Sequence, residues 1–174
     1  MAEATVSLEQ MVQQLQDRQD ITDCLHRYTR GVDRVDEELI RSAYHCDAID
    51  FHGPVNGTVD DFLAWWLPFQ PDREVSQHYV SNIAIDLDGD TAHVEAYFVF
   101  RHKLKSDPTM TISGGRYVDR YEKRDIGWRI AVRVVISEWA YVADGAETTK
   151  RRAVLYRGRR DRTDPVYARP LTGA

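Results

Sequence analysis

Apolar residues recur at intervals of three and four in the first part of the chain, a spacing that places them on one face of a helix. Ser7 and Gln10 stand at the two ends of a capping box, which predicts that this helix begins after Ser7. Gly31 is a suitable residue to end it. The apolar positions on the predicted face are Leu8, Met11, Val12, Leu15, Ile21, Leu25 and Tyr28.

Two shorter helices are expected to follow. The second covers about residues 36–44, where the apolar positions again share one face. The third follows Gly57, with Thr58 as its cap, and Pro68 and Pro71 end it. Its aromatic face consists of Phe62, Trp65, Trp66 and Phe69.

From about residue 75 the period of the apolar positions shortens to two, which predicts strands. Long strands are expected over residues 77–87, 91–104, 109–123 and 128–142, and a short one near residues 48–52. The sequence Asp-Gly-Asp between the first two long strands is a strong hairpin signal. A helical half followed by a meander of strands predicts an α+β fold, in which a curved, mostly antiparallel sheet wraps around three N-terminal helices.

Charge is distributed unevenly along the 174 residues. The net charge is −5, yet residues 150–174 contain eight basic and only two acidic residues. We therefore expect one domain over residues 1–149 and a basic C-terminal tail over residues 150–174. Apolar residues interrupt the basic run, so the tail is expected to dock on the acidic body rather than to bind nucleic acid. These residues are Val154, Leu155, Tyr156, Val166 and Tyr167.

Several kinds of site have no signal in the sequence. No apolar run is long enough to cross a membrane, and the N-terminus lacks the features of a secretion signal, so we expect a cytoplasmic protein without membrane contact. Cys24 and Cys46 form no metal-binding or redox spacing, and both are expected to be buried thiols. Neither a nucleotide motif nor a metal-ligand spacing is present, so no cofactor and no catalytic metal are expected.

Four short motifs together resemble the SnoaL-like branch of the NTF2-like superfamily, which includes scytalone dehydratase, bile-acid 7α-dehydratase and hexachlorocyclohexane dehydrochlorinase. They are residues 28–33 (YTRGVD), 45–48 (HCDA), 78–82 (HYVSN) and 121–130 (YEKRDIGWRI). The resemblance covers roughly residues 8–142 and implies a cone-shaped domain that encloses one pocket. It does not imply one reaction, because this fold carries many functions.

The resemblance also implies roles for individual residues. In the dehydratases of this family an Asp after the first helix pairs with a His on the sheet, and Asp33 and His78 match these positions. The imidazole would move a proton while the carboxylate fixes its tautomer. Tyr28 matches the family's Tyr, and Arg133 matches the pocket Arg of the dehydrochlorinase, so all four residues are expected to be catalytic. The alternatives are a core aromatic for Tyr28 and an outward-facing charge for Arg133.

Alternation along the strands adds candidate substrate contacts. Aromatic walls with a few polar groups suit a ring-containing ligand that carries hydroxyl groups. The resemblance supports only His102 among these positions, as the second pocket His of scytalone dehydratase, and plain core packing is the alternative for the aromatic residues. The expected substrate contacts are Asp50, His52, Trp65, Phe69, Phe98, Phe100, His102 and Tyr117.

The favoured function is a cofactor-independent lyase, most simply a dehydratase, for a small hydroxylated aromatic or polycyclic compound. Loss of a benzylic hydroxyl would give a quinone methide, which could drive loss of a neighbouring carbon as formaldehyde, as in relatives that cleave lignin-derived diols. The alternatives are an isomerase and a non-catalytic module resembling the β subunits of ring-hydroxylating dioxygenases. A homo-oligomer, dimer or trimer, is expected because the outer face of the sheet needs cover.

Overall fold

The first helix, α1, spans Leu8–Arg34 in a computed structural model that describes residues 7–144, 158–168 and 170. The predicted capping box is present, since the Ser7 side chain accepts from the backbone N–H of Gln10 and the Gln10 side chain accepts in return. The helix continues past Gly31 and ends where Val35 adopts a left-handed φ of 54°. The prediction that Gly31 ends the helix is therefore wrong.

Gly31 instead allows two helices to approach each other closely. The second helix, α2, spans Glu37–Arg41 and is capped by Asp36, so it is shorter than predicted. A Cβ atom at position 31 would lie 2.7 Å from Cγ1 of Ile40 in this helix. The tight turn from α1 into α2 thus needs a residue without a side chain.

The third helix, α3, spans Val59–Trp66 and begins with the predicted Thr58 cap, which forms a capping box with Asp61. A 3-10 turn, η1, follows over Leu67–Phe69. Pro68 lies within this turn, so the proline-rich end of the helix agrees with the sequence prediction.

Six strands form one curved sheet in the order β2-β1-β6-β5-β4-β3. The strands β3 to β6 follow one another as an antiparallel meander, and only the β1–β6 pair is parallel. This arrangement confirms the predicted α+β fold with a mostly antiparallel sheet. The strand bounds are Tyr44–Phe51 (β1), Asn56–Gly57 (β2), Arg73–Asp88 (β3), Thr91–Leu104 (β4), Met110–Arg124 (β5) and Gly127–Ala143 (β6).

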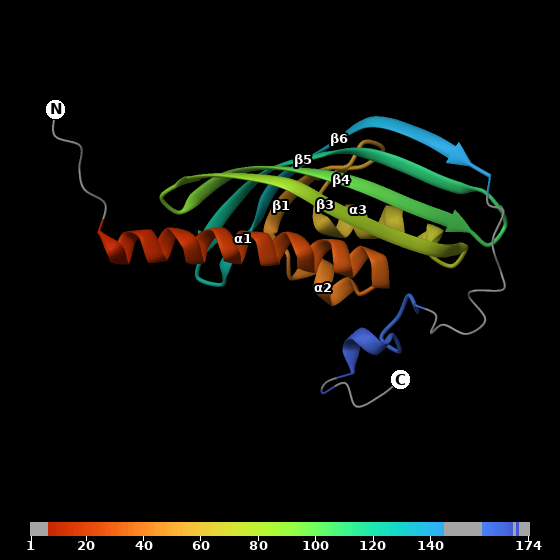
Figure 1. Cartoon of the computed structure of the whole chain (residues 1–174), viewed down its shortest axis with the longest axis horizontal. Helices are drawn as coiled ribbons and strands as arrows, with labels where there is room; N and C mark the ends of the chain where they lie inside the picture. Colours follow the sequence, from red (N-terminus) through yellow and green to blue (C-terminus); the bar gives the residue numbers. More distant parts are fainter. Residues whose placement is uncertain (1–6, 145–157, 169, 171–174) are drawn as a thin grey trace.

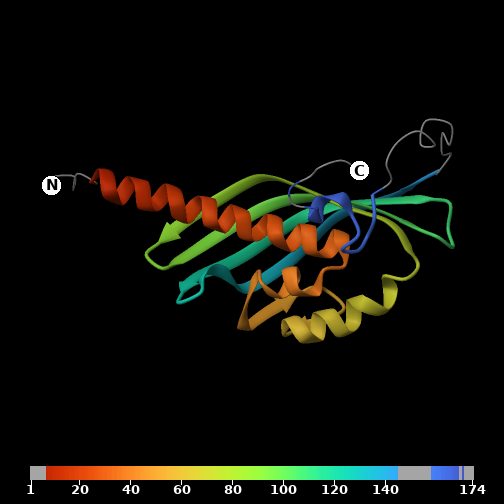
Figure 2. The same ribbon diagram turned by 90° about the horizontal axis from the view of Figure 1, so that it is seen from below.

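The helices lie against one face of the sheet, where α1 crosses the strands diagonally (Figures 1 and 2). Register shifts in β3 and between β5 and β6 interrupt the regular pairing, and such shifts bend strands. One of the shifts between β5 and β6 lies at Gly114 and Gly115. A Cβ atom on Gly115 would lie 1.9 Å from the carbonyl oxygen of Ile136, so this close approach requires glycine.

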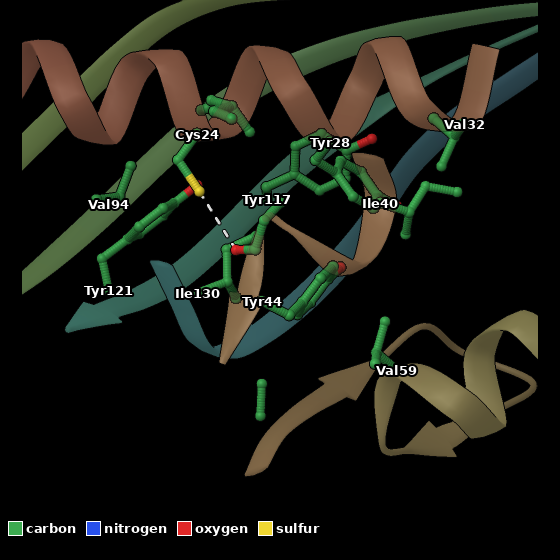
Figure 3. Packing of buried hydrophobic residues seen from close by; sticks show 14 of the residues in the cluster. Cys24, Tyr28, Val32, Ile40, Tyr44, Val59, Val94, Tyr117, Tyr121 and Ile130 are labelled. Atoms are coloured by element: carbon green, nitrogen blue, oxygen red, sulfur yellow. Dashed lines mark hydrogen bonds between the residues drawn. The ribbon is translucent and has the colours of Figure 1, made fainter. Parts of the chain in front are cut away.

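The core lies between α1 and the sheet. Tyr28 of α1 contacts Tyr44 of β1 and Tyr117 of β5, each at 5.8 Å between ring centroids (Figure 3). The thiol of Cys24 is buried here and donates to the carbonyl of Ala43 at 3.3 Å. Burial raises the pKa of this thiol to about 11, so it stays protonated at neutral pH.

Cys46 is exposed on β1, so the prediction that both thiols are buried is wrong for this residue. The short strand was expected to begin near residue 48, whereas β1 already begins at Tyr44. The pairing of β1 with β6 shifts register between Tyr44 and Ile49, which interrupts the alternation of side chains and leaves both Cys46 and Asp47 exposed.

The described part of the tail packs on the C-terminal end of α1 and on the acidic start of α2. Arg162 contacts Asp36 and Glu38 at 3.0 and 2.6 Å, and the hydroxyl of Tyr167 donates to Asp36 at 2.9 Å. These contacts agree with docking on the acidic body. Three of the expected docking residues, Val154, Leu155 and Tyr156, lie outside the described residues, as does the boundary between residues 149 and 150.

No helix within the described ranges combines the length and the apolar character needed to cross a membrane.

Candidate active site

A cavity of about 180 Å³ opens between the C-terminal half of α1, α3 and the strands β3 to β6. Its walls are mostly aromatic, and two histidines, two serines and one arginine supply the polar groups. The lining residues are Tyr28, Val32, His52, Phe62, Trp65, Trp66, Arg73, Ser76, His78, Phe98, Phe100, Ser113, Tyr117 and Val135.

Asp33 and His78 meet at the edge of this cavity. Asp33 is the second-last residue of α1 and His78 lies on β3. Nδ1 of His78 lies 2.7 Å from Oδ1 of Asp33, and the backbone N–H of His78 donates to Oδ2 at 2.9 Å. The hydroxyl of Ser76 also donates to Oδ1, at 3.0 Å. The carboxylate thus holds the strand and the imidazole ring together.

These hydrogen bonds keep Asp33 ionised. Burial alone would raise the pKa of Asp33, but the bonds and the charge of His78 outweigh it and hold the pKa below its usual value. An ionised Asp33 accepts the Nδ1 proton and leaves Nε2 of His78 as the nitrogen that can accept a proton. Phe100 fixes the ring plane by stacking at 4.3 Å between centroids.

A second histidine–aspartate pair faces the same cavity. Nδ1 of His52 lies 3.2 Å from Oδ1 of Asp50, and the hydroxyl of Tyr44 donates to Oδ2 of Asp50 at 2.7 Å. Burial would raise the pKa of Asp50, but the bond from His52 lowers it below its usual value. His52 lines the cavity and packs on Phe62 at 4.6 Å, whereas Asp50 lies buried behind it. His52 thus lines the cavity as expected, whereas the expected contact of Asp50 with substrate is wrong, because Asp50 contacts His52 and Tyr44 behind the lining.

Arg133 does not line the cavity. Its side chain is fully buried and forms two hydrogen bonds with Asp119, from Nε at 2.9 Å and from Nη2 at 2.6 Å. The guanidinium lies 4.2 Å from the ring centroids of both Tyr28 and Tyr117, and these two rings line the cavity whereas Arg133 does not. The expected contact of Arg133 with substrate is thus wrong, because an ion pair within the core satisfies the charge.

Two other expected contacts lie off the cavity. Phe69 is half exposed and packs on Trp65 from outside, at 5.7 Å between centroids. His102 stacks on Phe100 at 5.0 Å but does not reach the lining. Burial, Arg73 and His78 together lower the pKa of His102 to about 4, so this imidazole is neutral at physiological pH.

The remaining expected contacts, Trp65, Phe98, Phe100 and Tyr117, line the cavity, as does Tyr28. The polar lining residues that the sequence did not predict include Arg73 and Ser76. Both lie on β3 before residue 77, where the strand was expected to begin. Ser76 and His78 lie on the same face of the strand because they are two positions apart. A predicted strand that began before residue 77 would therefore have identified Ser76 as well.

No group of three or more His, Cys, Asp or Glu side chains within the described residues is arranged to hold a metal ion.

The chain matches the SnoaL-like domain over residues 13–134 and therefore belongs to this family, a branch of the NTF2-like superfamily. No curated protein is detectably similar in sequence.

Solved structures share the fold. One is a protein provisionally named scytalone dehydratase from Novosphingobium aromaticivorans, with 19% identity and a TM-score of 0.69, covering 74% of this chain and 88% of the other. A second is the hexachlorocyclohexane dehydrochlorinase LinA-type3 from Novosphingobium barchaimii, with 18% identity, a TM-score of 0.70 and coverage of 78% and 96%. A third is a provisional aromatic ring hydroxylase from N. aromaticivorans, with 21% identity, a TM-score of 0.67 and coverage of 76% and 98%. At these identities the likeness concerns the fold.

Proposed function

We propose that this protein is a cofactor-independent lyase that eliminates a leaving group, most simply water, from a small hydroxylated aromatic compound. The observation that carries the proposal is the contact between His78 and Asp33 at an aromatic cavity, with Nε2 of the imidazole left to accept a proton. The dehydratase and dehydrochlorinase names among the structural neighbours support the same class of reaction.

An elimination needs a base and an acid. In the proposed reaction Nε2 of His78 takes a proton from the carbon next to the leaving group, and the electron pair left behind forms the new double bond. Asp33 stabilises the imidazolium that results. Acid–base assistance of this kind contributes about 10²–10⁴-fold to a rate.

His52 is the proposed acid. It enters the reaction protonated and gives its proton to the departing hydroxyl, which leaves as water. Asp50 stabilises the protonated ring before the transfer, as a buried carboxylate partner of a histidine does. Each histidine has its own carboxylate, so one can hold a proton while the other accepts one. After product release the proton returns from His78 to His52 through solvent, and the net reaction is loss of water.

The size of the cavity favours a single aromatic ring. A dry cavity of about 150 Å³ accommodates benzene, and the cavity here has about 180 Å³. Phe98 and Tyr117 stack on each other at 4.6 Å along one wall and offer flat surfaces to a ring. A phenolic substrate would also allow the quinone methide route, in which a neighbouring carbon leaves as formaldehyde.

The proposal is tested by screening para-hydroxylated aryl alcohols and diols with the purified protein. A new conjugated double bond is followed by its absorbance, and formaldehyde by a trapping reagent. His78→Ala should abolish most of the turnover, whereas His26→Ala, which alters an exposed histidine of the same chain, should not. A His78→Ala protein with unchanged turnover would refute the assignment of the base.

Isomerisation is the second candidate, because two histidine–aspartate pairs at one cavity could also move a proton between two positions of one substrate. The product would then have the mass of the substrate, and mass spectrometry separates the two reactions. The non-catalytic module remains the proposal of a different class. It predicts that neither histidine variant changes any measured conversion.

A further inference from the structure

Arg73, the first residue of β3, carries a positive charge into the cavity wall, and none of the described residues forms an ion pair with it. Its guanidinium lies 5.3 Å from the ring centroid of Phe100 and it lines the cavity. Its Nε atom is buried and has no hydrogen-bond partner. Within the described residues it forms no ion pair, and the next residue, Glu74, pairs with Lys103 at 2.9 Å. Burial alone lowers the pKa of Arg73.

A second guanidinium, from the tail, strengthens the positive charge at this place. Arg160 donates to the side-chain oxygen of Gln70 at 2.8 Å and to the backbone oxygens of Arg73 and Asp33 at 3.1 and 3.3 Å. All these acceptors are neutral. Burial lowers the pKa of Arg160 to about 10, and the charge of Arg73 contributes to the shift. Two partly buried cations side by side are costly unless an anion joins them.

Within the described residues, the carboxylate that acts on this pair is Asp33, whose charge partly offsets the effect of burial on the pKa of Arg160. Its two oxygens already accept hydrogen bonds from His78 and Ser76, so this single charge does not neutralise both guanidinium groups. His102 is uncharged at neutral pH and can contribute no negative charge. The wall around Phe100 therefore has an excess of positive charge next to a surface that suits an aromatic ring.

We propose that Arg73 binds an anionic oxygen group of the substrate, a carboxylate on the aromatic compound, and that Arg160 reinforces its charge. The inference rests on the proposed function in that it names the substrate class of the same site. A guanidinium matches the planar geometry of a carboxylate, and its Nε is one of the donors that such a pair uses. The ring then extends from Phe100 towards Tyr117, between the two histidines.

Binding tests the inference without knowledge of the reaction. The probes are 4-hydroxybenzoate and 4-hydroxybenzamide, which have the same ring and nearly the same shape but differ in charge. Their affinities are measured by isothermal titration calorimetry at low and high salt. The unaltered protein should bind the carboxylate about 10–100-fold more tightly than the amide, the range for hydrogen bonds to charged groups, and salt should reduce the difference.

The variant Arg73→Gln should bind both probes with about the same, weaker affinity. Arg101→Gln is the matched control, because Arg101 is exposed on β4 and lies over Tyr79, at 5.3 Å from its ring; it should keep the preference. Arg73→Lys keeps the positive charge but loses the planar guanidinium that can form two parallel hydrogen bonds, so it should keep only part of the preference for the carboxylate. If Arg73→Gln does not fold, the unaltered protein still decides, because equal affinities for the two probes would overturn the inference. Retention of the preference in a folded Arg73→Gln would overturn it as well.

The outcome separates this inference from the proposed function. A preference for the carboxylate that depends on Arg73, without any elimination activity, supports the anion site and refutes the lyase. Elimination that requires His78 but acts equally well on neutral substrates supports the lyase and refutes the anion site.

Discussion

Replacement of Asp33 by Asn should disable His78 by changing which of its nitrogens carries the proton. The backbone N–H of His78 donates to one oxygen of Asp33, and its ring Nδ1 contacts the other at 2.7 Å. An asparagine keeps a single oxygen. If that oxygen continues to accept the backbone N–H, the amide NH₂ faces Nδ1, which must then lose its proton. The proton moves to Nε2, where a base needs a free lone pair.

The expected loss follows from this tautomer change. Acid–base catalysis is worth about 10²–10⁴-fold, equal to about 2.7–5.5 kcal/mol of transition-state stabilisation. Asp33→Asn and His78→Ala should each lower kcat by such a factor. The double variant should resemble the worse single variant, because residues that act as one unit give non-additive losses.

The assay is single-turnover formation of the unsaturated product, with the binding of neutral 4-hydroxybenzamide measured in parallel. Its affinity should stay unchanged in Asp33→Asn, because the aromatic walls are intact. His26→Ala serves as the control for a histidine outside the cavity. Losses that multiply in the double variant, or an Asp33→Asn protein with near-normal turnover, would show that the two residues do not act together.

Four further predictions concern stability and assembly. Arg133→Met leaves the buried Asp119 carboxylate without its partner and should lower the free energy of unfolding by about 3–5 kcal/mol in urea titrations; a loss below ~1 kcal/mol would contradict this account. His102 has a folded pKa of about 4, below the ordinary value of 6.5, so the unfolded chain takes up a proton first. Stability should therefore decline as the pH falls from 6.5 towards 4, and less so in His102→Asn; parallel pH profiles would be evidence against this. Gly31→Ala should cost about 1–3 kcal/mol because the new methyl group meets Ile40. Sedimentation should find a dimer or trimer at micromolar concentration that loses stability on deletion of residues 150–174; a monomer would refute the expectation.

Local patterns sufficed for most of the helices and strands, whereas the histidine–aspartate pair was predicted from the resemblance to a known family. The helix caps at Ser7 and Thr58 involve residues three positions apart, so the sequence displays both partners. Asp33 and His78 lie 45 positions apart, and only the resemblance to a known family connected them before the structure brought them within 2.7 Å.

Long-range pairing explains what the sequence did not reveal. The alternation of β6 correctly allows Arg133 to point inward, but its partner Asp119 is chosen by the register between β5 and β6, which a single sequence does not display. Arg160 reaches Gln70 and Arg73 across about half of the chain, whereas the sequence predicted only that the tail docks on the acidic body. The wrong prediction that Gly31 ends α1 has the same cause. The contact that requires glycine at this position is with Ile40, which belongs to the next helix.

Because Arg160 contacts the cavity wall, docking of the C-terminal segment and binding of a ligand in the cavity are thermodynamically coupled. An anion that neutralises Arg73 reduces the charge repulsion between Arg73 and Arg160. Ligand binding therefore favours tail docking, and tail docking favours ligand binding by the same free energy. Ligand should therefore slow cleavage of the tail by a protease, and removal of the tail should weaken the ligand to a corresponding extent. The segment that carries Arg160 lies outside the match to the SnoaL-like domain over residues 13–134, so mutations there can change affinity without altering the shape of the cavity.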